Sequence, residues 1–152
     1  MTAAQELAKF MAKYEPGIAR QTNRVLGKLR KRTPGAVEMV YDNYNALAIG
    51  FGPNEKVSLA IFSIALYPQH VNLFFLQGKG LPDPRKRLKG AGNLVRYIRL
   101  EGPETLDEPE VQELISVAMV RAKVKFDPKR KRKLVIKSVS EKQRPRRPAK
   151  KK

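Results

Sequence analysis

The strongest constraint on the fold is a central run of short apolar segments, between residues 37 and 100, interrupted by turn-forming residues. Tight-turn chemistry, with Asn, Asp, Gly or Pro, recurs at residues 42–45, 52–55 and 67–69. The segments between these turns have the length and the composition of strands. They predict about five strands, at residues 37–41, 47–51, 57–66, 70–77 and 94–100.

Helical periodicity flanks the strand region on both sides. Thr2 and Gln5 have capping-box spacing, and an apolar stripe at i, i+3, i+4 and i+7 follows from Leu7 to Tyr14. A second helix is expected over residues 16–32 and a third over residues 109–122. Runs of strands between runs of helices predict an α+β fold, an antiparallel sheet with the N-terminal and C-terminal helices packed on one face.

The chain of 152 residues has room for one domain with extensions, and its charge is unevenly spread. Residues 121–152 hold 16 of the 32 basic residues but only 2 of the 14 acidic ones. The predicted organisation is a folded domain at residues 1–122 and a basic, mostly disordered tail at residues 123–152, rich in Lys, Arg and Pro. Within that tail, residues 134–136 could add a short strand.

Several functional classes are excluded or disfavoured by missing residues. The chain has no Cys and one His, which excludes disulfides, thiolate zinc sites and multi-histidine metal sites within one chain. No signal peptide is visible, and the most apolar segment, residues 58–67, is about half the ~20 residues of a membrane span. We therefore expect a cytoplasmic protein with no membrane partner. No nucleophile motif is present, and His70 lacks a readable triad, so we expect no enzyme activity and no cofactor.

The basic residues suggest a polyanionic partner. Clustered Lys and Arg neutralise phosphates and release counterions, giving affinity that is independent of sequence and falls with salt. No aromatic residue follows Phe126, so the tail cannot stack on bases, and its binding to nucleic acid should be non-specific. A role in solubility alone is the alternative. The candidate contacts in the tail are Lys129, Arg130, Lys131, Arg132, Lys133, Arg144, Arg146 and Arg147.

A loop at residues 78–92 could add to this surface. It combines four glycines with cations, and glycine lets backbone N–H groups approach an anion. It lacks the Lys-Ser/Thr ending of a phosphate-binding loop, and a strand follows it, so a plain connecting loop is the alternative. Its candidate contacts are Arg85, Lys86, Arg87 and Lys89.

The sheet face without helices offers a third hypothesis. Phe74, Leu76, Val95 and Tyr97 alternate with the residues expected in the core. If they form one exposed apolar patch, it could bind a small molecule of unknown identity, a protein or a second copy of the chain as a homodimer.

Two stretches resemble the YdhG-like domain-of-unknown-function family. Residues 62–75 resemble its hairpin, with Tyr67 and His70 followed by an aliphatic and aromatic strand. Residues 87–109 resemble its second motif, a Lys-Gly loop, an Ile-Arg strand and an acidic-proline helix start. Residues 40–44 depart from the family's Tyr-Gly-Met-Pro segment, which places in doubt any ligand site built there.

The resemblance implies an α+β fold and little about activity. One branch of the family is described as a frataxin-like iron chaperone, and hard cations prefer oxygen ligands. The carboxylates that could serve here are Glu104, Asp107 and Glu108. The alternative is structural, because acidic residues at a helix N-terminus complement the helix dipole.

Overall fold

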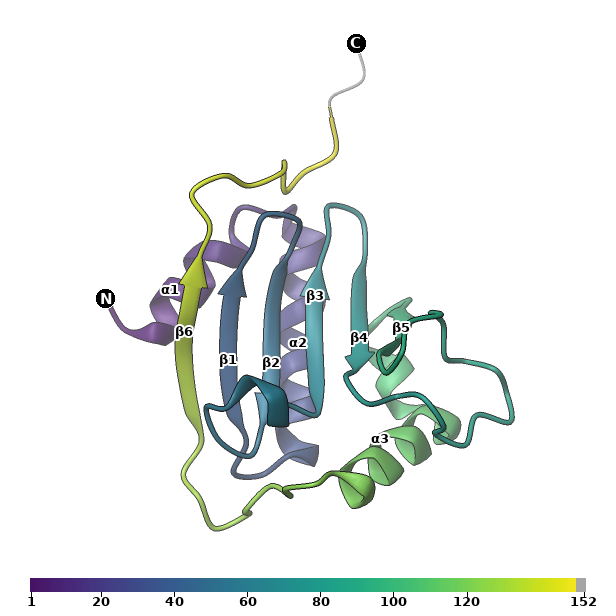
Figure 1. Ribbon diagram of the computed structural model, residues 1–152. Helices are drawn as coiled ribbons and strands as arrows, with labels where there is room; N and C mark the ends of the chain where they lie inside the picture. Colours follow the sequence, from purple (N-terminus) through teal and green to yellow (C-terminus); the bar gives the residue numbers. More distant parts are fainter. Residues whose placement is uncertain (150–152) are drawn as a thin grey trace.

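A six-stranded sheet with helices on one side forms the body of the protein, in a computed structural model that describes residues 1–149 (Figure 1). The strand order is β5-β4-β3-β2-β1-β6. The elements, in chain order, are α1 (Ala3–Met11), α2 (Pro16–Arg32), β1 (Val37–Asp42), β2 (Leu47–Gly52), the 3-10 helix η1 (Val57–Leu59), β3 (Phe62–Leu66), β4 (Val71–Phe75), β5 (Arg96–Leu100), the 3-10 helix η2 (Pro103–Asp107), α3 (Pro109–Arg121) and β6 (Lys133–Val139). The α+β class is confirmed.

Local signals explain where the first two helices begin. The Thr2 hydroxyl accepts a hydrogen bond from the Gln5 backbone N–H at 3.1 Å, and the Gln5 side chain accepts one from the Thr2 N–H at 2.8 Å. This capping box satisfies donors that a helix start leaves free. Pro16 opens α2, where its missing N–H costs no hydrogen bond.

Alternation along the strands divides the sheet into two faces. The face that packs on the helices carries the large apolar side chains of each strand, such as Ile49, Ile64 and Leu73, all fully buried. Tyr14 closes this core from the α1–α2 turn, because its hydroxyl donates to the Leu66 carbonyl and accepts from the Leu47 N–H. From α3, Val111, Leu114 and Ile115 enter the same core.

The sheet differs from the prediction in two respects. Residues 57–66 do not form one strand: 57–59 form η1, and β3 begins at Phe62. The η1 segment crosses the helix-free face (Figure 1). Ala60, which follows η1, packs on Val37 and Met39. Neighbouring pairs among β1 to β5 are antiparallel, but β6 pairs with β1 in parallel, so the sheet is mixed and has six strands instead of five.

Part of the stretch predicted to be mostly disordered, residues 123–152, is ordered as β6 and the contacts that hold it. We call residues 123–149 the C-terminal segment; residues 150–152 of the expected tail lie outside the described part. This segment runs beneath the sheet, along its edge as β6 and across its top (Figure 1). Leu134 and Ile136 pack against the helix-side core, and the short strand considered at residues 134–136 is part of β6. The edge of β1 that β2 leaves free forms the ladder with β6, and the amino-acid composition of the segment gives no sign of this pairing.

Two buried carboxylates of β1 attach this segment to the body. Asp42 is fully buried and receives Lys13 at 2.7 Å and Arg146 at 2.9 Å. Glu38, also buried, receives Arg30 at 2.8 Å and Arg132 at 3.1 Å. Each carboxylate therefore binds one cation from the N-terminal helical region and one from the C-terminal segment.

The turn before β1 needs glycine. Gly35 has a φ of 81°, and a Cβ built there would lie 1.8 Å from the Asp127 carbonyl oxygen. Any L side chain would strain this backbone and collide with the C-terminal segment. Gly35 thus lets the segment pass close under the end of α2.

At the start of α3, no described side chain caps the free backbone N–H groups. Thr105 and Asp107 fall in η2, and Glu108 is the N-cap residue, without a side-chain capping hydrogen bond. Pro109 occupies the first turn, as expected. Among residues 1–149, no helix is both long and apolar enough to span a bilayer.

Candidate nucleic-acid interface

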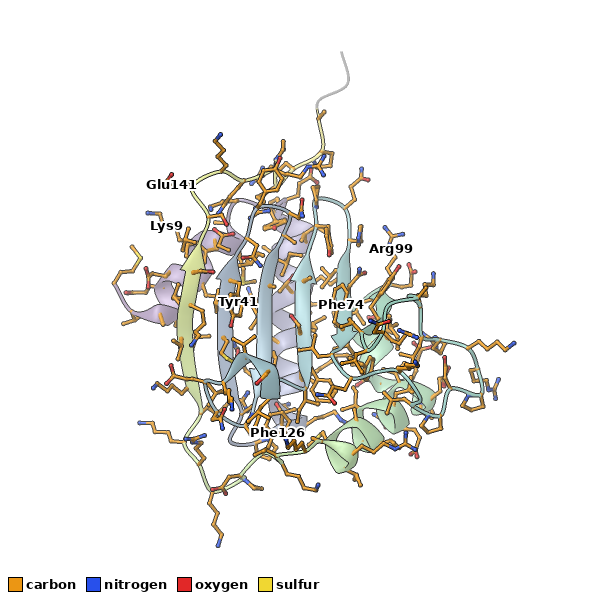
Figure 2. All side chains as sticks on the ribbon, viewed as in Figure 1. Lys9, Tyr41, Phe74, Arg99, Phe126 and Glu141 are labelled. Carbon is orange, nitrogen blue, oxygen red and sulfur yellow. The ribbon has the colours of Figure 1, made fainter. Side chains whose placement is uncertain are left out.

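The sheet face without helices, called here the open face, presents aligned rows of side chains. Strand register brings one row together from all six strands: Ser138, Tyr41, Ala48, Ala65, Asn72 and Arg99. A second row lies two residues away from the first along each strand. On β3, β4 and β5 it consists of Ser63, Phe74 and Tyr97. Figure 2 shows Tyr41 and Phe74 standing on the same side of the sheet, separated by β2 and β3.

Beside Phe74 the surface of the sheet is hollow. The hollow has a volume of about 540 Å³, and small side chains line it: Ala46, Ala48, Ser63 and Ala65. Tyr44, Tyr67, Phe74 and Leu76 form its walls, and Asn43, Asn45 and Ser140 border it at the top of the sheet. Since η1 covers the lower part of the face, this hollow is the exposed upper part.

Paired aromatic rings lie beside the hollow. The Phe74 and Tyr97 rings have centroids 5.4 Å apart and are tilted by 37°. Tyr67 stacks on His70, with centroids 4.7 Å apart. Burial, and then Tyr97, raise the pKa of Tyr67. Burial, and then Arg99, lower the pKa of His70 below its ordinary 6.5, so the imidazole is mainly neutral at pH 7.

Negative charge is nearly absent from the open face. The strands β2 to β6 contain no Asp or Glu, and the two in β1, Glu38 and Asp42, point to the helix side and are ion-paired. Glu55, in the β2–η1 connection, is bound by Lys133 at 2.7 Å, and this hydrogen bond lowers the pKa of Glu55. Arg99 stands exposed at the end of the first row. The face therefore presents apolar surface bordered by positive charge.

The candidate cations of the tail fall into two groups. The side chains of the first group already have partners within the protein. Arg132 and Arg146 bind buried carboxylates, Lys133 binds Glu55, and Arg130 donates to the Pro53 carbonyl. Arg147 donates to the backbone carbonyl of Lys13. In the other group, the side chains are exposed and have no hydrogen-bond or ion-pair partner within residues 1–149: Lys129, Lys131 and Arg144.

The loop cations divide in the same way. Arg87 is bound to Glu108 at 3.0 Å and Glu110 at 2.8 Å. This pairing raises the pKa of Arg87 and lowers that of Glu108. Exposed side chains without a partner in the described residues belong to Arg85, Lys86 and Lys89. The loop therefore contributes positive charge beside β5, where Lys89 pairs through its backbone with Tyr97.

The acidic residues considered for iron are not assembled into a site. Asp107 binds Lys28 at 2.6 Å, and Glu108 binds Arg87. Within the described residues, no three carboxylate or imidazole groups lie close enough to share a metal ion. The observed role of Asp107 and Glu108 is ion pairing around η2 and α3.

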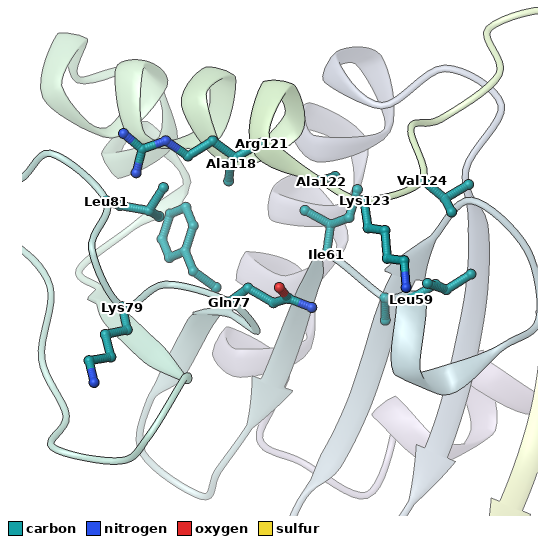
Figure 3. Close-up of a pocket in the computed structure, with 12 residues that line it drawn as sticks. Leu59, Ile61, Gln77, Lys79, Leu81, Ala118, Arg121, Ala122, Lys123 and Val124 are labelled. Carbon is teal, nitrogen blue, oxygen red and sulfur yellow. The ribbon is translucent and has the colours of Figure 1, made fainter.

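A separate crevice lies where the end of α3 meets β4 (Figure 3). It has a volume of about 220 Å³, with an apolar lining that includes Ile61, Phe75 and Leu81. Lys79, Arg121 and Lys123 supply its charge, and Arg121 donates to the Gly80 carbonyl at 2.8 Å. Its lining holds no carboxylate, imidazole or hydroxyl group. Such a lining can bind an apolar group next to an anion.

Sequence reasoning found part of this surface. Phe74, Leu76 and Tyr97 lie on the open face as predicted, while Val95 lies just before β5 and is 39% exposed. Tyr41 and Asn72 were missed, because only strand register places them in one row. The alternation of the small residues Ala48 and Gly50 with large side chains along β2 was the available sequence signal for a hollow on this face.

Compared with family models, curated proteins and solved structures, the chain has no significant match. The resemblance to YdhG-like domains stays a prediction.

Proposed function

We propose that this protein binds nucleic acid without sequence specificity, through exposed cations that surround the open face of its sheet. The observation that carries the proposal is the distribution of charge. The carboxylates of the strands and Glu55 are ion-paired, and Glu141, next to Ser140, is the exception near the open face, whereas Lys129, Lys131 and Arg144 remain exposed without partners in the described residues. Phosphate neutralisation by such cations releases counterions and favours any nucleic-acid backbone.

The order of the C-terminal segment strengthens this proposal in one respect and changes it in another. A fixed segment holds its cations at set positions around the sheet, so less entropy is lost on binding than with a disordered tail. However, Arg132 and Arg146 are used to hold β6 and are not available to phosphate. The binding surface therefore contains fewer cations than the net charge of +18 suggests.

The test uses point substitutions, because deleting residues 129–152 would also remove β6 and the two arginines, Arg132 and Arg146, that bind the buried carboxylates. The triple variant Lys129→Gln, Lys131→Gln and Arg144→Gln removes three exposed charges from the C-terminal segment. Binding of duplex DNA is measured by fluorescence anisotropy between about 50 and 200 mM salt. Each lost phosphate contact should reduce the log–log salt slope by about 0.9.

A matched control removes the same charge elsewhere. Lys9, Arg20 and Arg24 are exposed on α1 and α2, and their side chains have no partner in the described residues. We expect Gln at these three positions to leave the salt slope nearly unchanged. Equal losses in both triple variants would show an effect of net charge alone, and a wild-type protein that ignores DNA at low salt would refute the proposal.

A further inference from the structure

We propose that the hollow of the open face binds the unpaired bases of a single-stranded nucleic acid. This inference rests on the proposed function and adds the strand state of the partner. It starts from the width of the hollow. Its lining runs from Ala48 on β2 to Phe74 on β4, two strand spacings or about 10 Å apart. Small side chains lie between them. The space suits flat bases laid against aromatic rings.

The exposed rings supply the stacking surface. Phe74 and Tyr97 form one contiguous aromatic platform, and Tyr67 with His70 forms another on the adjoining turn. These side chains are half-buried, so one ring face is fixed by the protein while the remainder is accessible. Bases stack on such rings with little regard to sequence, because every base has a π-face. A duplex offers few free base faces, and its phosphates alone would not use this platform.

Two polar atoms on the first row lack partners. The Asn72 side-chain oxygen and the Tyr41 hydroxyl are buried, and neither makes a hydrogen bond within the described residues. Buried polar atoms are normally satisfied, and leaving one unpaired costs free energy. Because both atoms are shielded from solvent, a base reaches them only if neighbouring side chains move, so stacking on the exposed rings carries the proposal. Both residues share a row with Ala48 and Ala65, which line the hollow, but neither residue is itself part of the lining.

Charge complementarity then selects a polyanion over a neutral partner. Arg99 continues the row beyond Asn72, and Arg144 follows the chain that borders the hollow at Ser140. The Arg144 backbone N–H donates to the Tyr44 carbonyl at 2.8 Å, which fixes this residue above the hollow wall. Phosphates bound near Arg99 and Arg144, with bases between them, would match both the cationic border and the aromatic surface of the hollow.

The experiment compares an oligothymidylate with a hairpin duplex of equal length, by anisotropy at about 150 mM salt. Ala48→Leu fills the floor without changing charge, and Phe74→Ala removes half of the aromatic platform. Each should weaken binding of the single strand at least about fivefold, which is about 1 kcal/mol, and change duplex binding less than about twofold. Ala4→Leu, which adds the same atoms on the exposed side of α1, is the matched control.

Folding of each variant is checked by its urea midpoint and by tyrosine fluorescence, since the chain has no Trp. The Tyr67→Ala variant gives a second measurement, because it removes another ring from the wall of the hollow and should also weaken binding of the single strand. Equal weakening of both nucleic acids, or none, would overturn the inference. Salt-dependent binding of the duplex with no preference for the single strand would overturn it while leaving the proposed function intact. Failure to bind either polymer would refute the proposed function itself.

Discussion

The Arg146–Asp42 ion pair gives the sharpest test of how the C-terminal segment is held. Asp42 is fully buried, and the Arg146 side chain is 4% exposed. Arg146→Met keeps most of the side-chain volume but leaves Asp42 with Lys13 as its remaining cation. Breaking a buried pair from one side typically costs 3–5 kcal/mol. Because Lys13 stays at 2.7 Å, we expect a loss near the lower limit, about 3 kcal/mol.

This loss should be plain in equilibrium unfolding. In a domain of this size, 1 kcal/mol shifts the melting temperature by about 2–4 °C, so Arg146→Met should lower it by about 6–12 °C. Urea unfolding followed by circular dichroism gives the free energy directly. The double variant Arg146→Met, Asp42→Asn should recover part of the loss, because it no longer buries a carboxylate that lacks this partner.

Arg144→Met is the matched control. Arg144 lies two residues away and is exposed, and its side chain has no partner in the described residues. Its substitution should stay within about 0.5 kcal/mol of wild type. Equal, small effects of Arg146→Met and Arg144→Met would mean that the clamp does not hold the segment, and the reasoning would be refuted in favour of a loose tail.

Two further outcomes follow from other parts of the fold. Gly35→Ala should destabilise the protein by about 1–3 kcal/mol in urea, because of its positive φ and its contact with Asp127, whereas Gly17→Ala, with open space around it, should not; similar midpoints would contradict the geometry. The His70 imidazole should titrate below 6.5 in proton NMR, and Arg99→Gln should raise its pKa only in part, since burial is the larger cause. Because unfolding raises this pKa, the contribution of His70 to stability is complete above about pH 6.5 and is lost as pH falls through the folded-state pKa; a midpoint at or above 6.5 would contradict this.

The helices were predictable because their signals are local. The Thr2–Gln5 capping box and Pro16 mark their starts within a few residues. Alternation likewise identified the core side of the strands, which made Phe74 and Tyr97 members of the opposite face. These patterns depend only on residues that are close together along the chain, so the amino-acid sequence alone contains them.

The extent of order in the C-terminal segment was not predicted, because its stabilisation comes from residues far away in sequence. Judged alone, residues 123–149 contain too little apolar surface to fold. Glu38 and Asp42 supply charge, and β1 supplies a free edge, about a hundred residues earlier. The rows of the open face were unpredictable for the same reason, since only the register of four strands places Tyr41 and Asn72 in one row.

The parallel pairing of β6 with β1 also orders events during biosynthesis. A ribosome releases β1 long before β6, so the nascent chain carries an uncovered strand edge and two carboxylates that still lack their arginines. Such an edge attracts other extended chains. The last-made strand therefore completes the domain and shields it from intermolecular pairing, which makes the interval before its arrival the period in which a chaperone would matter most.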